Sequence, residues 1–168
     1  MPTNIEIKAR VRDPRVLESV ARSLSDMPPV VLRQRDTFFA CRDGRLKLRE
    51  FGCGKSELIW YRRIDSPGSK RSDYQITPVS EPEKLRAVLA GAYGTTQVVE
   101  KIRTLLHVGQ ARIHLDDVVG LGTFIELEVV LRDGQPEQDG HAIAADLMER
   151  LGIDPSDLVD RAYADLLR

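Results

Sequence analysis

The chain has 168 residues, of which 42% are hydrophobic and 30% charged, a composition typical of a globular protein. Its 25 basic and 26 acidic side chains give a net charge of -1, which disfavours a protein that coats nucleic acid through overall positive charge. No apolar run approaches the roughly 20 residues that span a bilayer, and the N-terminus lacks a signal-peptide pattern, so we expect a cytoplasmic protein without a membrane partner. The two cysteines, Cys41 and Cys53, are too few for a disulfide framework.

The first half of the chain predicts one helix among five strands. Residues 4–12 alternate polar and apolar side chains, which is typical of a strand. Asp13 and Pro14 then provide a capping side chain and a residue preorganised for a first helical turn, so a helix is predicted from here to before Pro28. Further strands are predicted at about 30–41, 44–51, 56–64 and 70–77, separated by the turn sequences RDG, GCGK and SPGSK.

The second half predicts three strands between helices. Ser80 and Glu83 have the spacing of a capping box, which predicts a helix over about 81–91. Strands are predicted at about 98–107, 110–117 and 122–131, and helices at 136–151 and from Asp154 to about Leu167. Short links between neighbouring strands favour antiparallel pairing. We therefore predict an α+β fold, an eight-stranded antiparallel barrel with flanking helices, formed by residues 1–168 as a single domain.

Charged residues occupy one face of nearly every predicted strand. In GRLKLRE, for example, Arg45, Lys47 and Arg49 alternate with Leu46 and Leu48. For any one strand alone, a solvated outer face explains this pattern. Some strands are cationic throughout, however, and another carries only acidic charges on that face. Because like charges directly across a sheet are destabilising, this segregation favours opposing walls of a charged barrel interior, with a ligand between them.

The predicted interior contains a cationic set and an acidic set. The cationic set consists of Lys8, Arg45, Lys47, Arg49, Arg63, Lys101, Arg103 and Arg112. The acidic set consists of Glu6, Asp116, Glu126 and Glu128. Arginine and lysine bind phosphate oxygens, and carboxylates are ligands that Mg²⁺ or Mn²⁺ prefers. Together the two sets predict a polyphosphate site that contains a divalent metal ion.

Segments across nearly the whole chain resemble the CYTH proteins, also called triphosphate tunnel metalloenzymes. This family includes class IV adenylyl cyclases, thiamine triphosphatases and inorganic tripolyphosphatases. Its N-terminal hallmark E-x-E-x-K is represented here by NIEIK, and the other matching segments follow in the family's order: DTFF, GRLKLR, LIWYRR, VVEKIR, RIHLDDVVGLGTFIELEV and RAYADLL. The resemblance implies a closed tunnel of eight antiparallel strands that holds a triphosphate end-on.

The resemblance also implies roles for individual residues. Glu6, Glu126 and Glu128 are expected to bind Mg²⁺ or Mn²⁺, with Asp116 as a contributor, and the whole cationic set is expected to bind the triphosphate. The family's tripolyphosphatases use a lysine and an arginine in catalysis, for which the candidates here are Lys8, Arg49 and Lys101. One position departs from the hallmark, because Asn4 replaces its first glutamate and offers an oxygen ligand without negative charge.

Several alternatives remain open from the sequence. The protein is expected to be a metal-dependent hydrolase of a small triphosphate, a class IV adenylyl cyclase that makes cyclic AMP and pyrophosphate, or a non-catalytic polyphosphate or nucleotide binder. No nucleic-acid partner is expected, and the protein is predicted to be a monomer or homodimer. His114 is expected to shuttle protons or to bond a neighbouring carboxylate. Tyr163 is expected to anchor the last helix, and Lys70 or Tyr74 to reach the tunnel.

Overall fold

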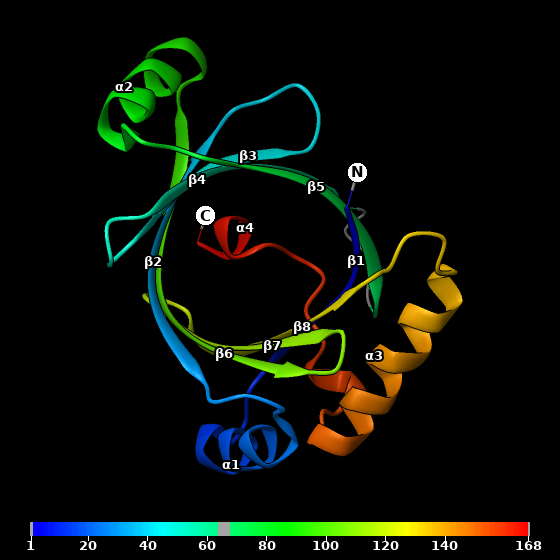
Figure 1. Cartoon of the computed structure of the whole chain (residues 1–168). Coiled ribbons are helices and arrows are strands. Elements are labelled where there is room, and N and C mark those ends of the chain that lie inside the picture. Colours follow the sequence, from blue (N-terminus) through cyan, green and yellow to red (C-terminus); the bar gives the residue numbers. More distant parts are fainter. Residues whose placement is uncertain (1, 64–67, 168) are drawn as a thin grey trace.

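Eight antiparallel strands close into a barrel in the computed structural model, which describes residues 2–63 and 68–167 (Figure 1). The strands are β1 (Thr3–Arg10), β2 (Val30–Phe39), β3 (Arg45–Phe51), β4 (Ser56–Arg63), β5 (Lys70–Pro78), β6 (Thr95–Val108), β7 (Ala111–Val118) and β8 (Gly122–Val130). Their order around the barrel is β1-β5-β4-β3-β2-β6-β7-β8, so the predicted fold class is confirmed. Ile64, at the end of the predicted strand 56–64, lies outside the described residues.

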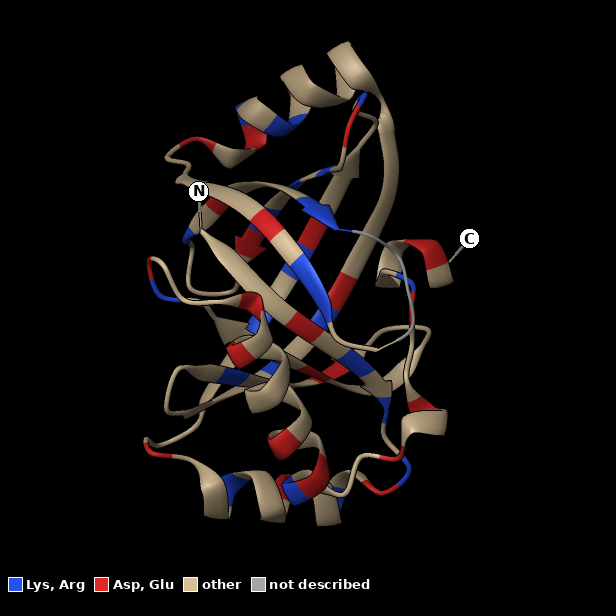
Figure 2. Cartoon of the chain, turned by 90° about the vertical axis from the view of Figure 1, so that its right-hand side faces the viewer, with Lys and Arg blue, Asp and Glu red and all other residues tan. Residues whose placement is uncertain are grey.

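Alternation along the strands separates a charged interior from an apolar outer wall. In β3, Lys47 and Arg49 face the interior, whereas Leu46 and Leu48 pack outward beneath helix α2 (Pro82–Tyr93). Figure 2 shows the same alternation as bands of charged and other residues along the strands. The polar side of this barrel is therefore its inside, as the distribution of charges in the sequence predicted.

The main hydrophobic core lies outside the barrel wall, beneath helices α1 (Pro14–Leu24) and α3 (Glu137–Leu151). Ile5 and Leu127 of the wall are fully buried there, and burying each such side chain stabilises the fold by about 1.5–3 kcal/mol. Gly140 allows α3 to approach closely, because a Cβ atom at this position would lie only 2.6 Å from Ile5 Cγ1. No helix within residues 2–63 and 68–167 is long and apolar enough to cross a membrane.

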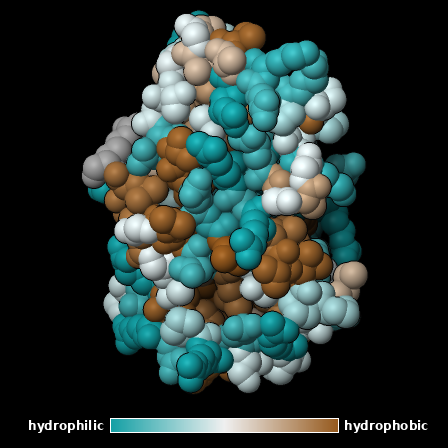
Figure 3. Space-filling model, turned by 90° about the vertical axis from the view of Figure 1, so that its left-hand side faces the viewer, coloured by the Kyte–Doolittle hydropathy of each residue, from teal (hydrophilic) through white to brown (hydrophobic). Residues whose placement is uncertain are grey.

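Part of the outer wall is not covered by a helix. Val31 of β2 is 63% exposed and Ile102 of β6 is 42% exposed. On the side of the molecule where β2 lies, hydrophobic residues form several surface groups separated by hydrophilic ones (Figure 3). These exposed side chains face away from the barrel interior, so they are not part of the charged cavity.

The start of α1 is as predicted, but that of α2 is not. The Asp13 side chain accepts hydrogen bonds from the backbone N–H groups of Arg15 and Val16, which confirms the predicted cap. In α2 the N-cap residue is Glu81, whose side chain makes no capping hydrogen bond, so the capping box predicted from Ser80 is wrong. Pro82, fixed near helical φ, places the start of α2 one residue too late for Ser80 to cap it.

The helix predicted from Asp154 to about Leu167 is also wrong. The segment instead contains a short 3₁₀ helix, Pro155–Asp157, and a one-turn helix α4, Tyr163–Leu166, with extended chain between them. Viewed along the barrel, α4 lies within the ring of strands (Figure 1). The C-terminal segment therefore covers one end of the barrel.

Hydrogen bonds to the barrel hold this segment in its extended conformation. Lys70 Nζ donates to the backbone carbonyl of Asp160 at 3.0 Å, and Lys8 Nζ donates to that of Arg161 at 3.1 Å. Val159 N–H donates to the Lys8 carbonyl at 2.8 Å. These long-range bonds occupy backbone groups that a continuous helix would have paired internally, which explains why local helical periodicity was misleading here.

Candidate active site

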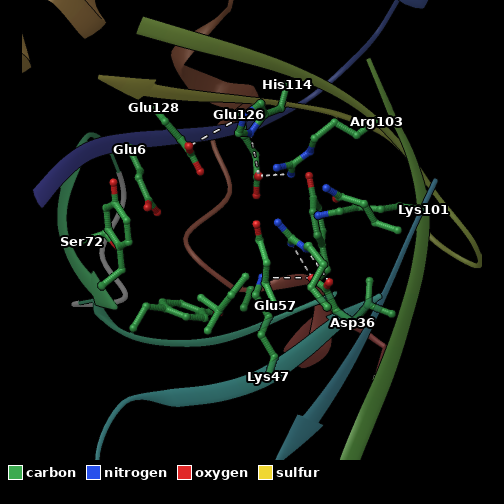
Figure 4. Close-up of a pocket in the computed structure, with 18 of the residues that line it drawn as sticks. Glu6, Asp36, Lys47, Glu57, Ser72, Lys101, Arg103, His114, Glu126 and Glu128 are labelled. Atoms are coloured by element: carbon green, nitrogen blue, oxygen red, sulfur yellow. Dashed lines mark hydrogen bonds and ion pairs between the residues drawn. The ribbon is translucent and has the colours of Figure 1, made fainter. Parts of the chain in front are cut away.

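The barrel interior contains a cavity of about 360 Å³, lined by residues from all eight strands and by the C-terminal segment (Figure 4). At one end it is closed by Ala162 and Tyr163, both of which are buried. At the other end it is open, because the cavity-lining Ile76 of β5 is 49% exposed. A ligand therefore has access from the end of the barrel opposite α4.

Seven of the eight predicted triphosphate-binding cations line this cavity: Lys8, Lys47, Arg49, Arg63, Lys101, Arg103 and Arg112. The eighth, Arg45, lies outside it near the closed end of the barrel. Its guanidinium donates to Asp165 of α4 at 2.8 Å. In this structure Arg45 therefore connects α4 to the barrel wall.

Asp36 of β2 holds two of these cations in place. Its carboxylate accepts two hydrogen bonds from Arg49, at 2.7 and 2.6 Å, and one from Lys47 at 3.0 Å (Figure 4). Asp36 is only 2% exposed. Burial alone would raise the pKa of Asp36, but Arg49 and Lys47 hold it well below its usual range. Asp36 thus remains ionised and orients both cationic side chains.

Asp116 of β7, two strands from β2 in the barrel, holds cations in the same way. It accepts two hydrogen bonds from Arg103, at 2.7 and 2.6 Å, and one from the Tyr163 hydroxyl at 2.9 Å. Lys101 Nζ lies 3.5 Å away. Burial would raise the pKa of Asp116, but Arg103 and Lys101 keep it far below its usual range. Asp116, predicted as an additional metal ligand, is not among the residues that line the cavity.

Glu126, Glu128 and His114 form a cluster with the geometry to hold a metal ion. Their potential ligand atoms all lie within 4.8 Å of one another. His114 is 4% exposed, and its Nδ1 atom has no hydrogen-bond partner in the described part of the chain. Burial and the nearby Arg103 lower the pKa of His114, which favours the neutral imidazole that binds metals. His114 thus gains a third possible role beyond the two expected from the sequence.

Glu6 brings a third carboxylate close to this cluster. Figure 4 shows the side chains of Glu6, Glu126 and Glu128 projecting into the cavity from β1 and β8. Burial and the negative charge of Glu128 raise the pKa of Glu6, although Arg63 lies 3.3 Å from its carboxylate. A divalent ion would remove this repulsion, so the donor set fits Mg²⁺ or Mn²⁺.

Lys8 and Lys101 lie deepest, beside Tyr163 at the closed end. Lys8 Nζ is 3.1 Å from Glu126 and 3.7 Å from the centre of the Tyr163 ring. Lys101 Nζ is 5.0 Å from the same ring centre. Burial and the neighbouring Arg103 lower the pKa of Lys101 to about 7. Tyr163 anchors α4 as expected, and it also lines the cavity.

Several cavity residues had not been singled out as site residues from the sequence. They are Gln34 and Asp36 of β2 and Glu57 of β4. The signal was present, because Asp36 is part of DTFF and each residue shares the inward phase of its strand. Of the two weaker candidates, Tyr74 lines the cavity, whereas Lys70 binds the C-terminal backbone.

Asn4, the departure from the hallmark, also faces the cavity. It is 3% exposed, and its Oδ1 atom accepts no hydrogen bond from the residues described. A buried amide oxygen without a partner is costly unless a ligand or water supplies one. Asn4 can therefore contribute a neutral oxygen to whatever the acidic wall binds.

A family model described as CYTH domain matches residues 2–163 of the chain. No curated protein matches the chain. The PH1012 protein from Pyrococcus horikoshii has the same fold, with a TM-score of 0.87 and 23% identity over 97% of this chain and 98% of that chain.

Two further similar structures are described as candidate cyclases. An adenylate cyclase candidate from Vibrio parahaemolyticus has a TM-score of 0.78 and 20% identity, covering 98% of this chain and 97% of its own. HpAC1 from Hippeastrum is an adenylyl cyclase candidate described as having a dominant triphosphatase activity. It has a TM-score of 0.65 and 16% identity over 98% of this chain and 93% of that chain. At these identities, the structural matches establish the fold alone.

Proposed function

Because the chain belongs to the CYTH domain family, we propose that it is a divalent-metal-dependent hydrolase of a small triphosphate bound inside the barrel. The observation that carries this proposal is the joint placement of seven cations and a metal-binding donor set in one cavity. Five carboxylates also line it: Glu6, Asp36, Glu57, Glu126 and Glu128. Asp116, which pairs with Arg103 behind the lining residues, reduces the excess of cations to one, and a divalent ion would add two positive charges, so the site suits a ligand of net negative charge.

Arg49 and Arg103, the two arginines that pair with aspartates, are proposed to bind the phosphate groups. Arg49 and Arg103 are each held in a bidentate pair, by Asp36 and Asp116 respectively. Their orientation is thus set before substrate arrives, so less conformational entropy is lost on binding. The remaining N–H donors of each guanidinium are available for phosphate oxygens, whose charge increases during phosphoryl transfer.

The acidic cluster is proposed to hold the metal ion. Glu126, Glu128 and His114 would hold the divalent ion, which would polarise phosphoryl oxygens, and Glu6 and Asn4 offer further oxygen donors on the same side. This chain's own residues supply the remaining chemistry: the cations position the triphosphate so that water can attack a phosphorus atom.

Lys101 is proposed to donate a proton to the leaving phosphate oxygen, and the proton that the attacking water releases to solvent restores the protonated form of Lys101. Its pKa of about 7 allows Nζ to gain or release a proton near neutral pH. Protonated Lys101 can neutralise charge on the leaving phosphate, with Lys8 supplying a second positive charge beside it.

A panel assay tests this proposal. Purified protein is incubated with tripolyphosphate, ATP or thiamine triphosphate, with Mg²⁺, Mn²⁺ or EDTA, and both phosphate and cyclic AMP are measured. We expect phosphate release that requires metal and that falls strongly in Lys101→Gln. Absence of turnover on every substrate with either metal would rule out the proposal.

A second candidate function is adenylyl cyclase activity, because two similar structures are described as candidates for it. The same cations would hold ATP, and the ribose 3′-hydroxyl rather than water would attack the α-phosphorus. Cyclic AMP produced in amounts equal to pyrophosphate would favour cyclisation. Phosphate without cyclic AMP would favour hydrolysis.

A third candidate is a non-catalytic binder, for which Asn4 is the relevant observation, since it lacks the charge of the hallmark glutamate. Tight tripolyphosphate binding without turnover would support it, and Asn4→Glu should then produce activity.

A further inference from the structure

Three neighbouring strands, β2, β6 and β7, share an outer face that carries exposed side chains. We call it the β2–β6–β7 face, and it consists of Val31, Arg33, Ile102, Thr104, Leu115 and Asp117. Chain neighbours of these residues, such as Leu32, Lys101 and Arg103, line the cavity, so side-chain alternation points the face away from the cavity. Val31 is 63% exposed and Ile102 is 42% exposed. Apolar side chains are therefore in contact with solvent on this part of the outer wall.

One row of residues across these strands has opposite charges at its two ends. Arg33 pairs with Ile102 in the register of β2 with β6, and Ile102 pairs with Asp117 in the register of β6 with β7. Neighbouring strands lie about 5 Å apart, so the backbones of Arg33 and Asp117 lie about 10 Å apart, on opposite sides of Ile102. Both side chains are exposed, and neither has an ion pair within residues 2–63 and 68–167. The face thus carries a positive charge at its β2 edge and a negative charge at its β7 edge.

The adjacent row supplies apolar contact area. Val31 pairs with Thr104, and Thr104 pairs with Leu115. Leu115 is half-buried, because it also packs against the main hydrophobic core. Exposed apolar side chains bordered by polar ones are typical of protein interaction sites. The two rows together therefore have the composition of such a site.

The row on the other side of Arg33 is electrically neutral. Arg35 Nε lies 3.6 Å from Glu100 Oε1, and both side chains are about half exposed. Val119, which follows β7, donates its backbone N–H to the Glu100 carbonyl at 3.0 Å and is 65% exposed. This row adds an exposed apolar side chain without changing the charges at the two edges of the face.

The charge pattern of the face is complementary to itself. In a symmetric dimer, a two-fold axis that runs parallel to β6, between two facing copies, brings β2 of each copy opposite β7 of the other. Arg33 of each copy then lies opposite Asp117 of the other copy, so symmetry produces two ion pairs. Ile102 meets its own equivalent at the axis, and Val31 lies opposite Leu115. An axis across the strands would instead place Arg33 opposite Arg33, so like charges disfavour that arrangement.

We propose that the β2–β6–β7 face is the interface of a homodimer, in which a second copy of this chain packs on it with the strands of the two barrels aligned. Aligned packing is usual for two sheets that meet face to face. A nucleic acid or an anionic membrane fits this face less well, because it would attract Arg33 and repel Asp117. The proposed interface uses no residue that lines the cavity, so it is independent of the proposed function.

Charge reversal tests the proposed pairing. Sedimentation velocity compares the proteins across micromolar to submillimolar concentrations at low ionic strength. We expect the wild type to form dimers, and Arg33→Glu or Asp117→Arg to raise the dimer dissociation constant at least about tenfold, because each change creates two contacts between like charges. The double variant Arg33→Glu/Asp117→Arg should dimerise like the wild type. An equimolar mixture of the two single variants should form heterodimers, since opposite charges again face each other in both cases.

Two further variants test the apolar part of the interface. Ile102→Asp should also abolish the dimer, because it places two carboxylates side by side at the axis. Val88→Asp is the matched control, since Val88 of α2 is 65% exposed and lies outside the face, so this variant should dimerise like the wild type. All the substituted residues are exposed, and thermal unfolding followed by circular dichroism checks that each variant retains its fold.

A wild-type protein that stays monomeric throughout this concentration range would overturn the inference. A dimer that neither charge reversal weakens would also overturn it, because Arg33 and Asp117 would then lie outside the interface. The same holds if the single variants lose association and neither the double variant nor the mixture restores it. Restored association in both would support the proposed two-fold arrangement.

Discussion

Replacing Asp36 with asparagine should destabilise the protein strongly and make its stability depend on a bound anion. The wild-type carboxylate accepts three hydrogen bonds, two from Arg49 and one from Lys47, and is 2% exposed. Asparagine has nearly the same shape but no charge, and only one of its two terminal atoms accepts hydrogen bonds. The variant would therefore leave two buried cations beside each other without their shared counter-charge.

The expected cost is about 3–5 kcal/mol, the usual range when one partner of a buried ion pair is removed. For a chain of this length, each kcal/mol corresponds to about 2–4 °C in Tm, so a fall of about 10 °C is expected. The low pKa of Asp36 also sets the pH range. Because the folded pKa lies below the unfolded value of about 3.9, the stabilisation is present above that value. The difference between the two proteins should hold from about pH 5 to 8 and shrink below about pH 4.

Thermal unfolding followed by circular dichroism, with and without tripolyphosphate, checks this. The anion should raise the Tm of Asp36→Asn more than that of the wild type, because phosphate replaces the missing negative charge. Asp43→Asn is the matched control, since Asp43 is exposed and its pair with Arg62 at 3.5 Å contributes little. A change below about 1 kcal/mol in Asp36→Asn, or equal anion stabilisation in both proteins, would refute this account of Asp36.

Three other predictions concern single groups of the site. Lys101, with a pKa of about 7, is mostly neutral at pH 8, so the protein should take up a proton when it binds tripolyphosphate at this pH. The calorimetric heat of binding should therefore depend on the ionisation enthalpy of the buffer. Lys101→Arg should abolish this dependence. Tyr163→Phe removes a buried hydrogen bond to Asp116 and should cost about 2 kcal/mol in chemical denaturation; no measurable loss would contradict its anchoring role. Glu128→Gln should weaken Mn²⁺ binding by at least about tenfold, as measured by electron paramagnetic resonance. Glu100→Gln, on the exposed outer face, should leave Mn²⁺ affinity unchanged. Equal Mn²⁺ affinities of the two variants would exclude the acidic cluster as the metal site.

Much of the barrel could be predicted from the sequence because a strand has a period of two. Once Lys47 and Arg49 were assigned to one face of β3, Leu46 and Leu48 had to occupy the other. The same periodicity brought seven of the eight predicted cations into the cavity. The charges of successive strands showed which face was the interior, since so many cations need nearby counter-charge.

Periodicity could not reveal which charged residues pair with one another. Asp36 and Asp116 both lie on inward-facing sides of strands, yet each is enclosed by an arginine from a neighbouring strand. Those pairs depend on the register of β2 with β3 and of β6 with β7. A sequence specifies register only through the packing of all strands together, so the supporting role of both aspartates was not apparent from it.

The sequence by itself determined the kind of wall and the kind of chemistry: alternating strands, a charged interior, and cations with carboxylates suited to a metal–triphosphate complex. Only the tertiary structure decided how that interior is closed and how the outer face is arranged. Lys8 and Lys70 bind backbone carbonyls of the C-terminal segment, so the chain between its 3₁₀ helix and α4 is extended instead of helical, and the segment closes one end of the barrel. The register of β2, β6 and β7 aligns Arg33, Ile102 and Asp117 in one row on the outer wall. Both outcomes depend on contacts between residues far apart in the chain, whereas local sequence patterns specify only which face each side chain occupies.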